Sequence, residues 1–459
     1  MSRYTSATDD DRRAMLEAIG IGSVDELFAD IPEGVRFRER LDIPPGMAET
    51  EVFDHLRSLA ARNVSADDEV SFVGAGMYDH YVPGLVEHII ERSEFLTPYT
   101  PYQPEVSQGN LQAMFEYQTA ISELTGLPVS NASVYEGPSA VGAAAYVAKL
   151  TNGRPRVLVS RGVHPHSRDV LKAMGHGYGV RTEEVQLRAG VTDAAALAGA
   201  LDSDVSAVVL QQPNFLGAVE DLEALAAAAK EHGAVVIAAC DPLPLALLKT
   251  PGESGVDLAV GEGQTLGNRL DFGGPSFGFF AAAEAFLRKM PGRISGETTD
   301  VEGRRGWVLT LQTREQHIRR EKATSNICTA QALNALAGVV YLSYLGRRGI
   351  VELAELMLQR TAYAREALGA LDGVEPLHEQ PVVREFAVTL DAPVDEVIAR
   401  CAAQGINPGY PLGRDDPDLA DGLLVAVSER RTREQIDRLA EVLGGAVAEL
   451  RTSAKAATA

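Results

Sequence analysis

The sequence contains very little lysine. Only seven of its 42 basic residues are lysines, against 35 arginines. The lysines lie at positions 149, 172, 230, 249, 289, 322 and 455. A lysine amine forms a Schiff base with a carbonyl compound, and an arginine cannot replace it in that role. Covalent chemistry of this kind would have to use one of seven positions, so each of them can be considered in turn.

Cysteine is also scarce. The three cysteines, Cys240, Cys328 and Cys401, are far apart in the chain and form no C-x-x-C pair. Their spacing argues against a disulfide framework and against a zinc site, and it is typical of proteins in a reducing compartment. We therefore expect no metal site.

The chain has no long hydrophobic run. No uncharged apolar stretch approaches the roughly 18 residues that a membrane-spanning helix needs. The N-terminal sequence MSRYTSATDDDRRAMLEAIG has no apolar segment after a basic start, so it does not resemble a secretory signal. We expect a cytoplasmic protein that does not enter a membrane.

Acidic residues outnumber basic ones. The formal net charge of the 459-residue chain is −22, which argues against binding to nucleic acid or to an anionic membrane. Hydrophobic residues make up 45% of the chain and charged residues 23%, as in an ordinary globular enzyme. The acidic charge is interpreted as a contribution to solubility.

Four segments can be distinguished along the chain. Residues 1–65 are predicted to form an N-terminal helical arm, because TDDDRRAMLEAIG has an N-cap, an acidic first turn and a C-terminal glycine. Residues 66–326 are predicted to form a large α/β domain. A long helix from about 327 to 347 opens a smaller C-terminal α/β domain that ends near 450. The small polar residues 451–459 are expected to form a frayed tail.

Strand-like apolar runs alternate with helical stretches in the large domain. The predicted strands are 154–160, 181–187, 205–211, 234–240, 257–261 and 276–281. The predicted helices include those around 165–175, 192–201 and 220–231. Strands that alternate with helices of this length indicate a mostly parallel sheet with helices on both faces.

Three polar features follow one another along this pattern. The Gly-Pro-Ser turn at Ser139 opens an alanine-rich helix, where backbone N–H groups and a hydroxyl could bind an anion; a plain helix start is the alternative. His164 follows a strand, where it could stack on an aromatic cofactor or only cap the next helix. Asp241 ends a buried strand, where it could pair with the pyridinium nitrogen of pyridoxal phosphate (PLP) or only cap a turn.

A Ser-bearing helix start, a His after a strand and an Asp at a strand end, in this order, form the outline of the large PLP-enzyme fold. That chemistry also needs a lysine, expected in the loop after the next strand. The loop belongs to DLAVGEGQTLGN (257–268) and has Glu262, Gly263 and Gln264 instead. None of the seven lysines lies at a suitable place, so the outline of the fold is present without its covalent anchor. Gln264 is a candidate for a vestigial cofactor-binding residue in this loop.

Long stretches of the sequence resemble a known family. Residues 77–140 (MYDHYVPGLVEH… to …NASVYEGPSA), 260–280 (VGEGQTLGNRLDFGGPSFGFF) and 292–333 (GRISGETTDVEGRRGW… to …NICTAQAL) are similar to subunit 1 of the P protein of the glycine cleavage system. The similarity extends over nearly the whole chain.

The resemblance implies a fold-type I, PLP-transferase-like fold and a split enzyme. In that family only subunit 2 carries the Schiff-base lysine and holds PLP, and subunit 1 is a pseudo-enzyme half that completes a heteromeric unit, paired into a tetramer. The implied reaction is the decarboxylation of glycine, with transfer of the aminomethyl group to the lipoyl arm of the H protein. Glycine, the PLP-bearing subunit and the H protein are therefore the expected partners.

Active sites of such dimers lie at the subunit interface, so loops of this chain are candidates to complete the partner's pocket. The first candidate loop is TPYTPYQPE (97–105), which offers Tyr99, Thr100, Tyr102, Gln103 and Glu105; a structural proline-rich loop is the alternative. The second is KATSNICT (322–329), which contains the three interface candidates Thr324, Ser325 and Asn326 together with Thr329. Cys328 in this loop is either redox-sensitive or a buried small thiol.

Two rival interpretations remain. The chain could be a self-sufficient PLP-dependent decarboxylase or aminotransferase that uses an unexpected lysine such as Lys249. It could also be a scaffold without a catalytic role, which only stabilises its partner.

Overall fold

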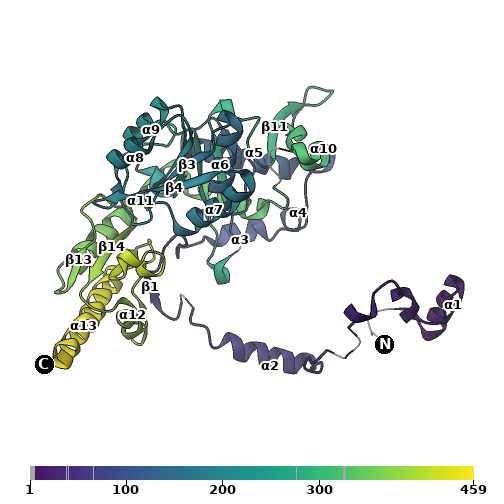
Figure 1. Ribbon diagram of the computed structural model, residues 1–459, viewed down its shortest axis with the longest axis horizontal. Coiled ribbons are helices and arrows are strands. Elements are labelled where there is room, and N and C mark those ends of the chain that lie inside the picture. The colour runs from purple at the N-terminus through teal and green to yellow at the C-terminus, as the bar shows by residue number, and fades with distance from the viewer. Residues whose placement is uncertain are drawn as a thin grey trace. The chain divides into compact units, whose positions relative to one another are not determined.

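The computed structural model describes residues 6–37, 39, 41–65, 67–274, 276–323 and 327–458. The chain divides into two compact units, Met1–Val64 and Ser65–Ala459. In Figure 1 the helices and strands of both units are coloured from purple at the N-terminus to yellow at the C-terminus. No helix in the described part is long and apolar enough to cross a membrane.

The first unit consists of short helices: α1 (Asp9–Ile19), η1 (Val24–Phe28), η2 (Glu33–Val35) and α2 (Glu49–Ala60). The Thr8 hydroxyl accepts a hydrogen bond from the Asp11 backbone N–H, the Asp11 carboxylate accepts one from that of Thr8, and Gly20 ends α1 with φ 86°. These are the boundary features that the sequence predicts. None of the four helices contains a buried residue, so the described residues of this unit form no hydrophobic core of their own.

A seven-stranded sheet forms the centre of the second unit, in the order β2 (Val129–Ser130), β10 (Gly278–Ala282), β9 (Leu258–Glu262), β8 (Val235–Cys240), β7 (Val205–Gln212), β3 (Arg156–Ser160) and β4 (Arg181–Val185). The strands from β9 to β4 are parallel to one another, and β10 is antiparallel to both of its neighbours. The sheet is therefore mixed but mostly parallel, as the sequence predicts, and β10 is its single reversed strand.

Both faces of this sheet are covered by helices. Along β8, Val236, Ala238 and Cys240 belong to one hydrophobic cluster, and Val235, Ile237 and Ala239 belong to another. Side chains alternate between the two faces of a strand, so each cluster marks one face. The first cluster includes residues of α5 (Gln108–Thr125), α9 (Leu222–Glu231) and α11 (Ala332–Gly369). The second includes residues of α6 (Gly137–Asn152) and α7 (Pro165–Tyr178).

The C-terminal part contains a four-stranded antiparallel sheet, in the order β13 (Val374–Pro376), β14 (Glu385–Leu390), β17 (Gly422–Ala426) and β16 (Tyr410–Pro411). It packs with α12 (Val394–Ala402) and α13 (Arg433–Thr458) around a separate core, at one end of the unit in Figure 1. The short strand β1 (Val70–Ser71) pairs with β15 (Ile406–Asn407), which joins the segment after Val64 to this small domain.

Two predicted boundaries differ from the structure. The long helix expected at 327–347 is α11, which begins at Ala332 and continues to Gly369, because Gly346 (φ 62°, ψ 178°) makes a kink rather than an end. The frayed tail expected at 451–459 is helical over residues 451–458, since α13 continues to Thr458, and Ala459 lies outside the described residues. The alanines and the lysine in this stretch favour a helix, and their small size does not by itself indicate an irregular tail.

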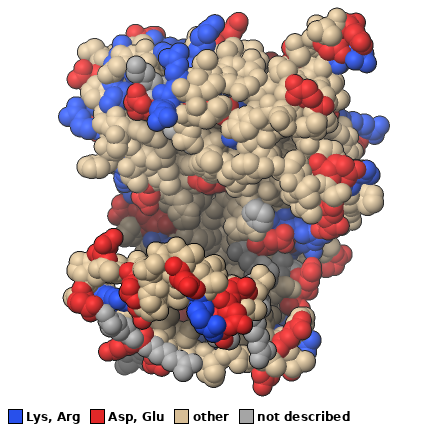
Figure 2. Space-filling model, turned by 90° about the vertical axis from the view of Figure 1, so that its right-hand side faces the viewer, with Lys and Arg blue, Asp and Glu red and all other residues tan. Residues whose placement is uncertain are grey.

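One further element is a hairpin of β11 (Ile294–Thr299) and β12 (Arg305–Thr310). On the face shown in Figure 2, acidic side chains are spread over much of the surface with basic ones among them. The many acidic side chains agree with the formal net charge of −22.

Candidate functional site

A cavity of about 400 Å³ lies at the carboxyl ends of the parallel strands. It is lined by Gln211 at the end of β7, Asp241 after β8 and Glu262 at the end of β9, together with the start of α6 and the segment 75–78. Ligands of open α/β sheets bind at this edge, so the cavity is the first candidate site. Among the residues that the structure describes, no lysine lines it.

The Glu262 carboxylate lies at the N-terminus of α6. It accepts hydrogen bonds from the backbone N–H of Gly137 (3.0 Å) and of Gln264 (3.2 Å), and from the Ser276 hydroxyl. Burial raises the pKa of Glu262, and these hydrogen bonds oppose the shift. Glu262 is the last residue of β9, directly before the loop in which the sequence pattern predicts the lysine of a PLP enzyme, and its carboxylate is directed at the start of α6.

The remaining donors of the first turn of α6 are also used. The Ser139 backbone N–H donates to the Glu136 carboxylate (2.9 Å), and the Ser139 hydroxyl donates to the Glu136 carbonyl (3.1 Å). Pro138 has no N–H to offer. Ser139 thus lies beside the cavity, as a helix-start residue, but it is not among the residues that line it.

Asp241 pairs with Arg384, which precedes β14 in the small domain. The Arg384 guanidinium lies over the Tyr78 ring, 3.4 Å from its centroid, and donates to His80 Nε2 (2.5 Å). Because an arginine can only donate, the His80 Nδ1–H donates to the Glu429 carboxylate (2.6 Å). Asp241 is therefore the first member of a chain of charged and polar groups that ends in the small domain.

His164 also lines the cavity, at the N-terminus of α7. Its Nδ1 accepts from the His166 backbone N–H (3.1 Å), and its Nε2–H donates to the Ala75 carbonyl (2.8 Å). Burial lowers the pKa of His164, which favours the neutral ring. Gly76 lies so close to the ring that a Cβ there would be 2.9 Å from Nε2.

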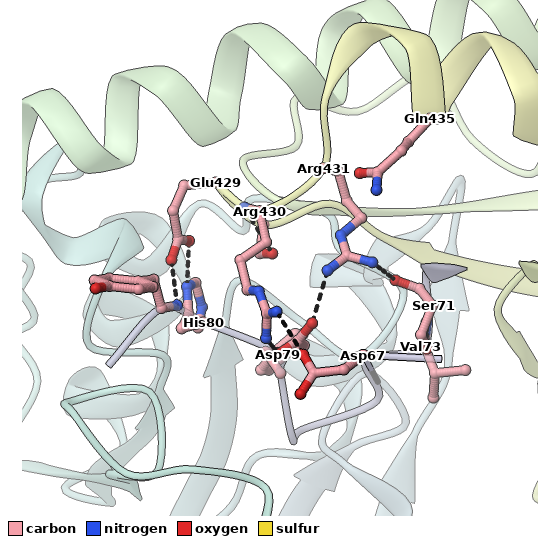
Figure 3. A network of polar contacts seen from close by, with 12 residues as sticks. Asp67, Ser71, Val73, Asp79, His80, Glu429, Arg430, Arg431 and Gln435 are labelled. Atoms are coloured by element: carbon pink, nitrogen blue, oxygen red, sulfur yellow. Dashed lines mark hydrogen bonds and ion pairs between the residues drawn. The ribbon is translucent and has the colours of Figure 1, made fainter. Parts of the chain in front are cut away.

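The segment that covers the cavity is fixed to the small domain by the network in Figure 3. Asp79 pairs with Arg430 (2.5 Å) and with Arg431 (2.7 Å), and Arg431 also donates to the Ser71 carbonyl (3.1 Å). The Glu429 carboxylate accepts from the Tyr81 backbone N–H (2.6 Å). These contacts hold residues 71–81 in place, and Tyr78 with them.

Glu385 and Gln264 hold the same segment from the other side. The Glu385 carboxylate accepts from the Ala75 backbone N–H (2.8 Å) and from the Tyr78 hydroxyl (2.8 Å). The Gln264 side chain is fully buried; it accepts from the Tyr78 N–H (2.9 Å) and donates to the Tyr78 carbonyl (3.0 Å). Gln264 therefore supports the backbone and is not among the residues that line the cavity.

The loop 97–105 lies beside a second cavity of about 200 Å³, which Tyr99, Thr100 and Arg293 help to line. The Tyr102 hydroxyl accepts from Arg293 (3.3 Å) and donates to Glu315 (3.5 Å).

Four of the five candidate side chains of this loop are exposed in this chain. They are Tyr99, Tyr102, Gln103 and Glu105. Of the two tyrosines, Tyr99 is the more available for contact with another molecule, because it is 71% exposed and Tyr102 is 44% exposed.

The second predicted loop can be assessed only in part. Thr324, Ser325 and Asn326 lie outside the described residues. Cys328 is exposed; its backbone N–H donates to the Tyr135 hydroxyl (2.9 Å), and the Tyr99 hydroxyl lies 3.4 Å from that of Thr329. The alternative of a buried Cys328 is wrong for this chain, and loops 97–105 and 327–329 meet at Tyr99.

Four of the lysines make contacts within the chain that indicate structural roles. Lys149 donates to the carbonyls of Tyr178 and Gly179 (2.5 and 2.7 Å). Lys172 pairs with Glu184, Lys230 with Asp257 and Lys249 with Glu223. In the part of the chain that the structure describes, no group of three or more His, Cys, Asp or Glu side chains could hold a metal ion.

The first cavity does not fit PLP as the side chains stand. The cofactor needs a lysine, anion donors for its phosphate and a free carboxylate for its ring nitrogen. The described lining residues include no lysine, the donors of α6 are bonded to Glu136 and Glu262, and Asp241 is paired with Arg384.

The chain is similar over most of its length to known proteins. A family model of the glycine cleavage system P-protein matches residues 2–443. The probable glycine dehydrogenase (decarboxylating) subunit 1 of Geobacillus thermodenitrificans is 48% identical over 444 residues, which cover 97% of this chain and 99% of the relative. The corresponding protein of Brevibacillus brevis is 50% identical over 442 residues, covering 96% and 98%.

Solved structures also show similarity to this chain in sequence or in fold. A crystal structure of glycine decarboxylase (P-protein) of the glycine cleavage system, in inhibitor-bound form, superposes with a TM-score of 0.87 at 43% identity and covers 97% of this chain and all of that one. A cysteine desulfurase of Escherichia coli shares only the fold, with a TM-score of 0.63 at 15% identity over 84% of this chain and 96% of the other. The predicted PLP-enzyme-like fold is thereby confirmed. The chain belongs to the P-protein family of the glycine cleavage system and corresponds over nearly its whole length to subunit 1 of glycine dehydrogenase (decarboxylating).

Proposed function

We propose that this chain acts with a PLP-bearing subunit 2 in the decarboxylation of glycine, and that it contributes side chains to an interface active site without holding the cofactor. The observation that carries the proposal is that no lysine is among the described residues lining the first cavity, where the Glu262 carboxylate is bonded to the start of α6 instead. Being a subunit 1, the chain requires a partner subunit.

In the proposed reaction the carboxyl group of glycine leaves as carbon dioxide. The remaining aminomethyl carbon bonds to one sulfur of the oxidised lipoyl group of the H protein, the S–S bond breaks and the second sulfur takes up a proton. PLP on the partner supplies the electron sink for loss of the carboxyl group. Two such heterodimers are proposed to pair into a tetramer.

The contribution of this chain is assigned to the loop 97–105. Its prolines restrict the backbone, and its hydroxyl, amide and carboxylate groups are exposed in the isolated chain, where a partner can reach them. Arg293 and Glu315 hold the Tyr102 hydroxyl from both sides, so this side chain is oriented before any partner binds. Such pre-organised groups position a substrate at low entropic cost.

The test is an assay of each chain alone and of the mixture. The two subunits are produced separately and together, and carbon dioxide released from carboxyl-labelled glycine is measured in the presence of lipoylated H protein. The mixture is expected to be active and each single chain inactive. Release of carbon dioxide by this chain alone would contradict the proposal and would favour a self-sufficient enzyme.

A further inference from the structure

The N-terminus of α6 is the place in this fold where a phosphate group would find backbone donors. A helix start binds anions because its first N–H groups are unpaired within the helix and its dipole favours negative charge. In this chain both N–H groups of the first turn that could face a ligand already donate to carboxylates, Gly137 to Glu262 and Ser139 to Glu136.

The position of Glu262 is fixed by close packing as well as by hydrogen bonds. A Cβ added to Gly137 would lie 3.0 Å from the Glu262 backbone nitrogen and 3.1 Å from its Cβ. The end of β9 therefore packs directly against the helix start, and Ser276 holds the same carboxylate from the opposite side. A phosphate cannot reach the Gly137 N–H unless the Glu262 side chain leaves.

The opposite end of the cavity is closed by charge pairing. Asp241 is bonded to Arg384, whose side chain is 4% exposed and stacks on Tyr78. A ring nitrogen that needs this carboxylate would have to displace a buried arginine, and that would leave the arginine without its partner.

We propose that the chain's own side chains seal its ancestral cofactor cavity: Glu262 occupies the phosphate position and Arg384 occupies the carboxylate that would bind the pyridine ring. The cavity consequently rejects PLP and other phosphate esters, even without covalent attachment. Each pair of subunits then holds one cofactor, on the partner. This inference concerns only the cavity of this chain and does not depend on the role proposed for the loop 97–105.

The Thr265 side chain indicates what would happen if the Glu262 carboxylate were removed. The Thr265 hydroxyl lines the cavity, is 2% exposed and has no hydrogen-bond partner within the described residues. Together with the N–H of Gly137 and the hydroxyl of Ser276 it would supply three donors to an anion. Replacing Glu262 by a small residue should therefore convert the sealed helix start into a phosphate site.

The experiment is calorimetric titration of the full-length chain, and of its complex with subunit 2, with inorganic phosphate. The wild-type chain is expected to show no saturable binding, and Glu262→Ala is expected to bind one phosphate at least about tenfold more tightly than the upper limit that the titration sets for the wild type. Glu231→Ala removes the same charge at an exposed helix end and should behave as the wild type. Glu262→Gln keeps the shape without the charge and is expected to show a smaller gain, which protects the test if the alanine variant fails to fold.

A second ligand tests the ring end of the cavity. 4-Deoxypyridoxine 5′-phosphate carries the ring and the phosphate but no aldehyde, so it should bind Glu262→Ala no more tightly than inorganic phosphate does while Arg384 is present. Saturable binding of either ligand to the wild-type chain, or two PLP molecules per subunit pair in the complex, would overturn the proposal. Folded Glu262 variants without any gain would overturn the role of this carboxylate.

Discussion

The Arg384 guanidinium forms an ion pair with the Asp241 carboxylate across the boundary between the large sheet and the small domain. Asp241 follows β8 and Arg384 precedes β14, so the pair joins the large sheet to the small domain. Both side chains are largely removed from solvent, at 16% and 4% exposure. The Asp241 carboxylate could pair with the ring nitrogen of a cofactor, but in this chain it fixes the large sheet and the small domain against each other.

Breaking this pair should destabilise the chain. Arg384→Met leaves Asp241 without its cation, and the loss of one partner of a largely buried pair costs about 3–5 kcal/mol. Urea denaturation followed by circular dichroism measures the change. The matched control is Arg348→Met, which removes an exposed ion pair with Glu352 and should change stability by less than about 0.5 kcal/mol. Equal effects of the two substitutions would contradict a structural role for the Arg384 pair.

Glu385 should make the stability of the chain depend on pH. Burial raises the pKa of Glu385 from 4.5 to about 7, so the folded state binds this proton more tightly than the unfolded state does. The corresponding stability is full below about pH 4.5 and is lost as the pH rises through 7. Glu385→Gln removes the titration but can still accept from Ala75 and contact the Tyr78 hydroxyl. We expect the variant and the wild type to have similar melting temperatures at pH 4.5 and the variant to be more stable at pH 8; parallel pH profiles would contradict the assignment.

The network around Asp79 predicts a local effect as well as a global one. Asp79→Asn weakens the contacts to Arg430 and Arg431, of which Arg431 is 4% exposed, and should cost about 2–4 kcal/mol. The segment 71–81 should also become more accessible to protease. Asp372→Asn is the control, because Asp372 is 91% exposed in its pair with Arg451. Unchanged cleavage of the segment in Asp79→Asn would show that the network does not hold it.

Substitutions in the loop 97–105 distinguish a chain that contributes to the reaction from a scaffold that only stabilises its partner. The triple substitution of Tyr99, Tyr102 and Glu105 by alanine should leave assembly with subunit 2 intact and lower glycine decarboxylation by at least about tenfold, since lost positioning groups act on the reaction. Assembly is measured by size-exclusion chromatography and activity by release of carbon dioxide. Normal activity of the assembled variant would support the scaffold interpretation.

Most strands of the large sheet could be predicted, because buried parallel strands are continuous apolar runs bounded by turns. The direction of β10 could not, since the run 276–281 is equally apolar in either direction. The β11–β12 hairpin was not predicted as a pair of strands, because its outer half is polar and exposed and its alternation of apolar and polar residues is incomplete. Gly346 misled the placement of the helix end, since a kink and a stop have the same residue signal.

The parts of the candidate site that lie at the ends of strands could be predicted from the sequence. His164 and Asp241 line the cavity as their positions after strands suggest, and the missing lysine is visible in the sequence at 262–264. Arg384, Tyr78 and His80 were missed, because an ion pair between distant segments leaves no local pattern. The one available signal was the pair of charges at the start of β14, with Arg384 directly before the strand and Glu385 as its first residue. Gln264 was placed near the cavity, but its role in supporting Tyr78 depends on contacts that sequence alone does not give.

The central claim is that the covalent anchor of the cofactor lies on the partner and not on this chain. The most direct measurement is borohydride reduction of the assembled complex in the presence of PLP, followed by mass-spectrometric mapping of both subunits. The account predicts a reduced pyridoxyl group on a lysine of subunit 2 and none on the seven lysines of this chain. A stoichiometric adduct on any of those seven would contradict it.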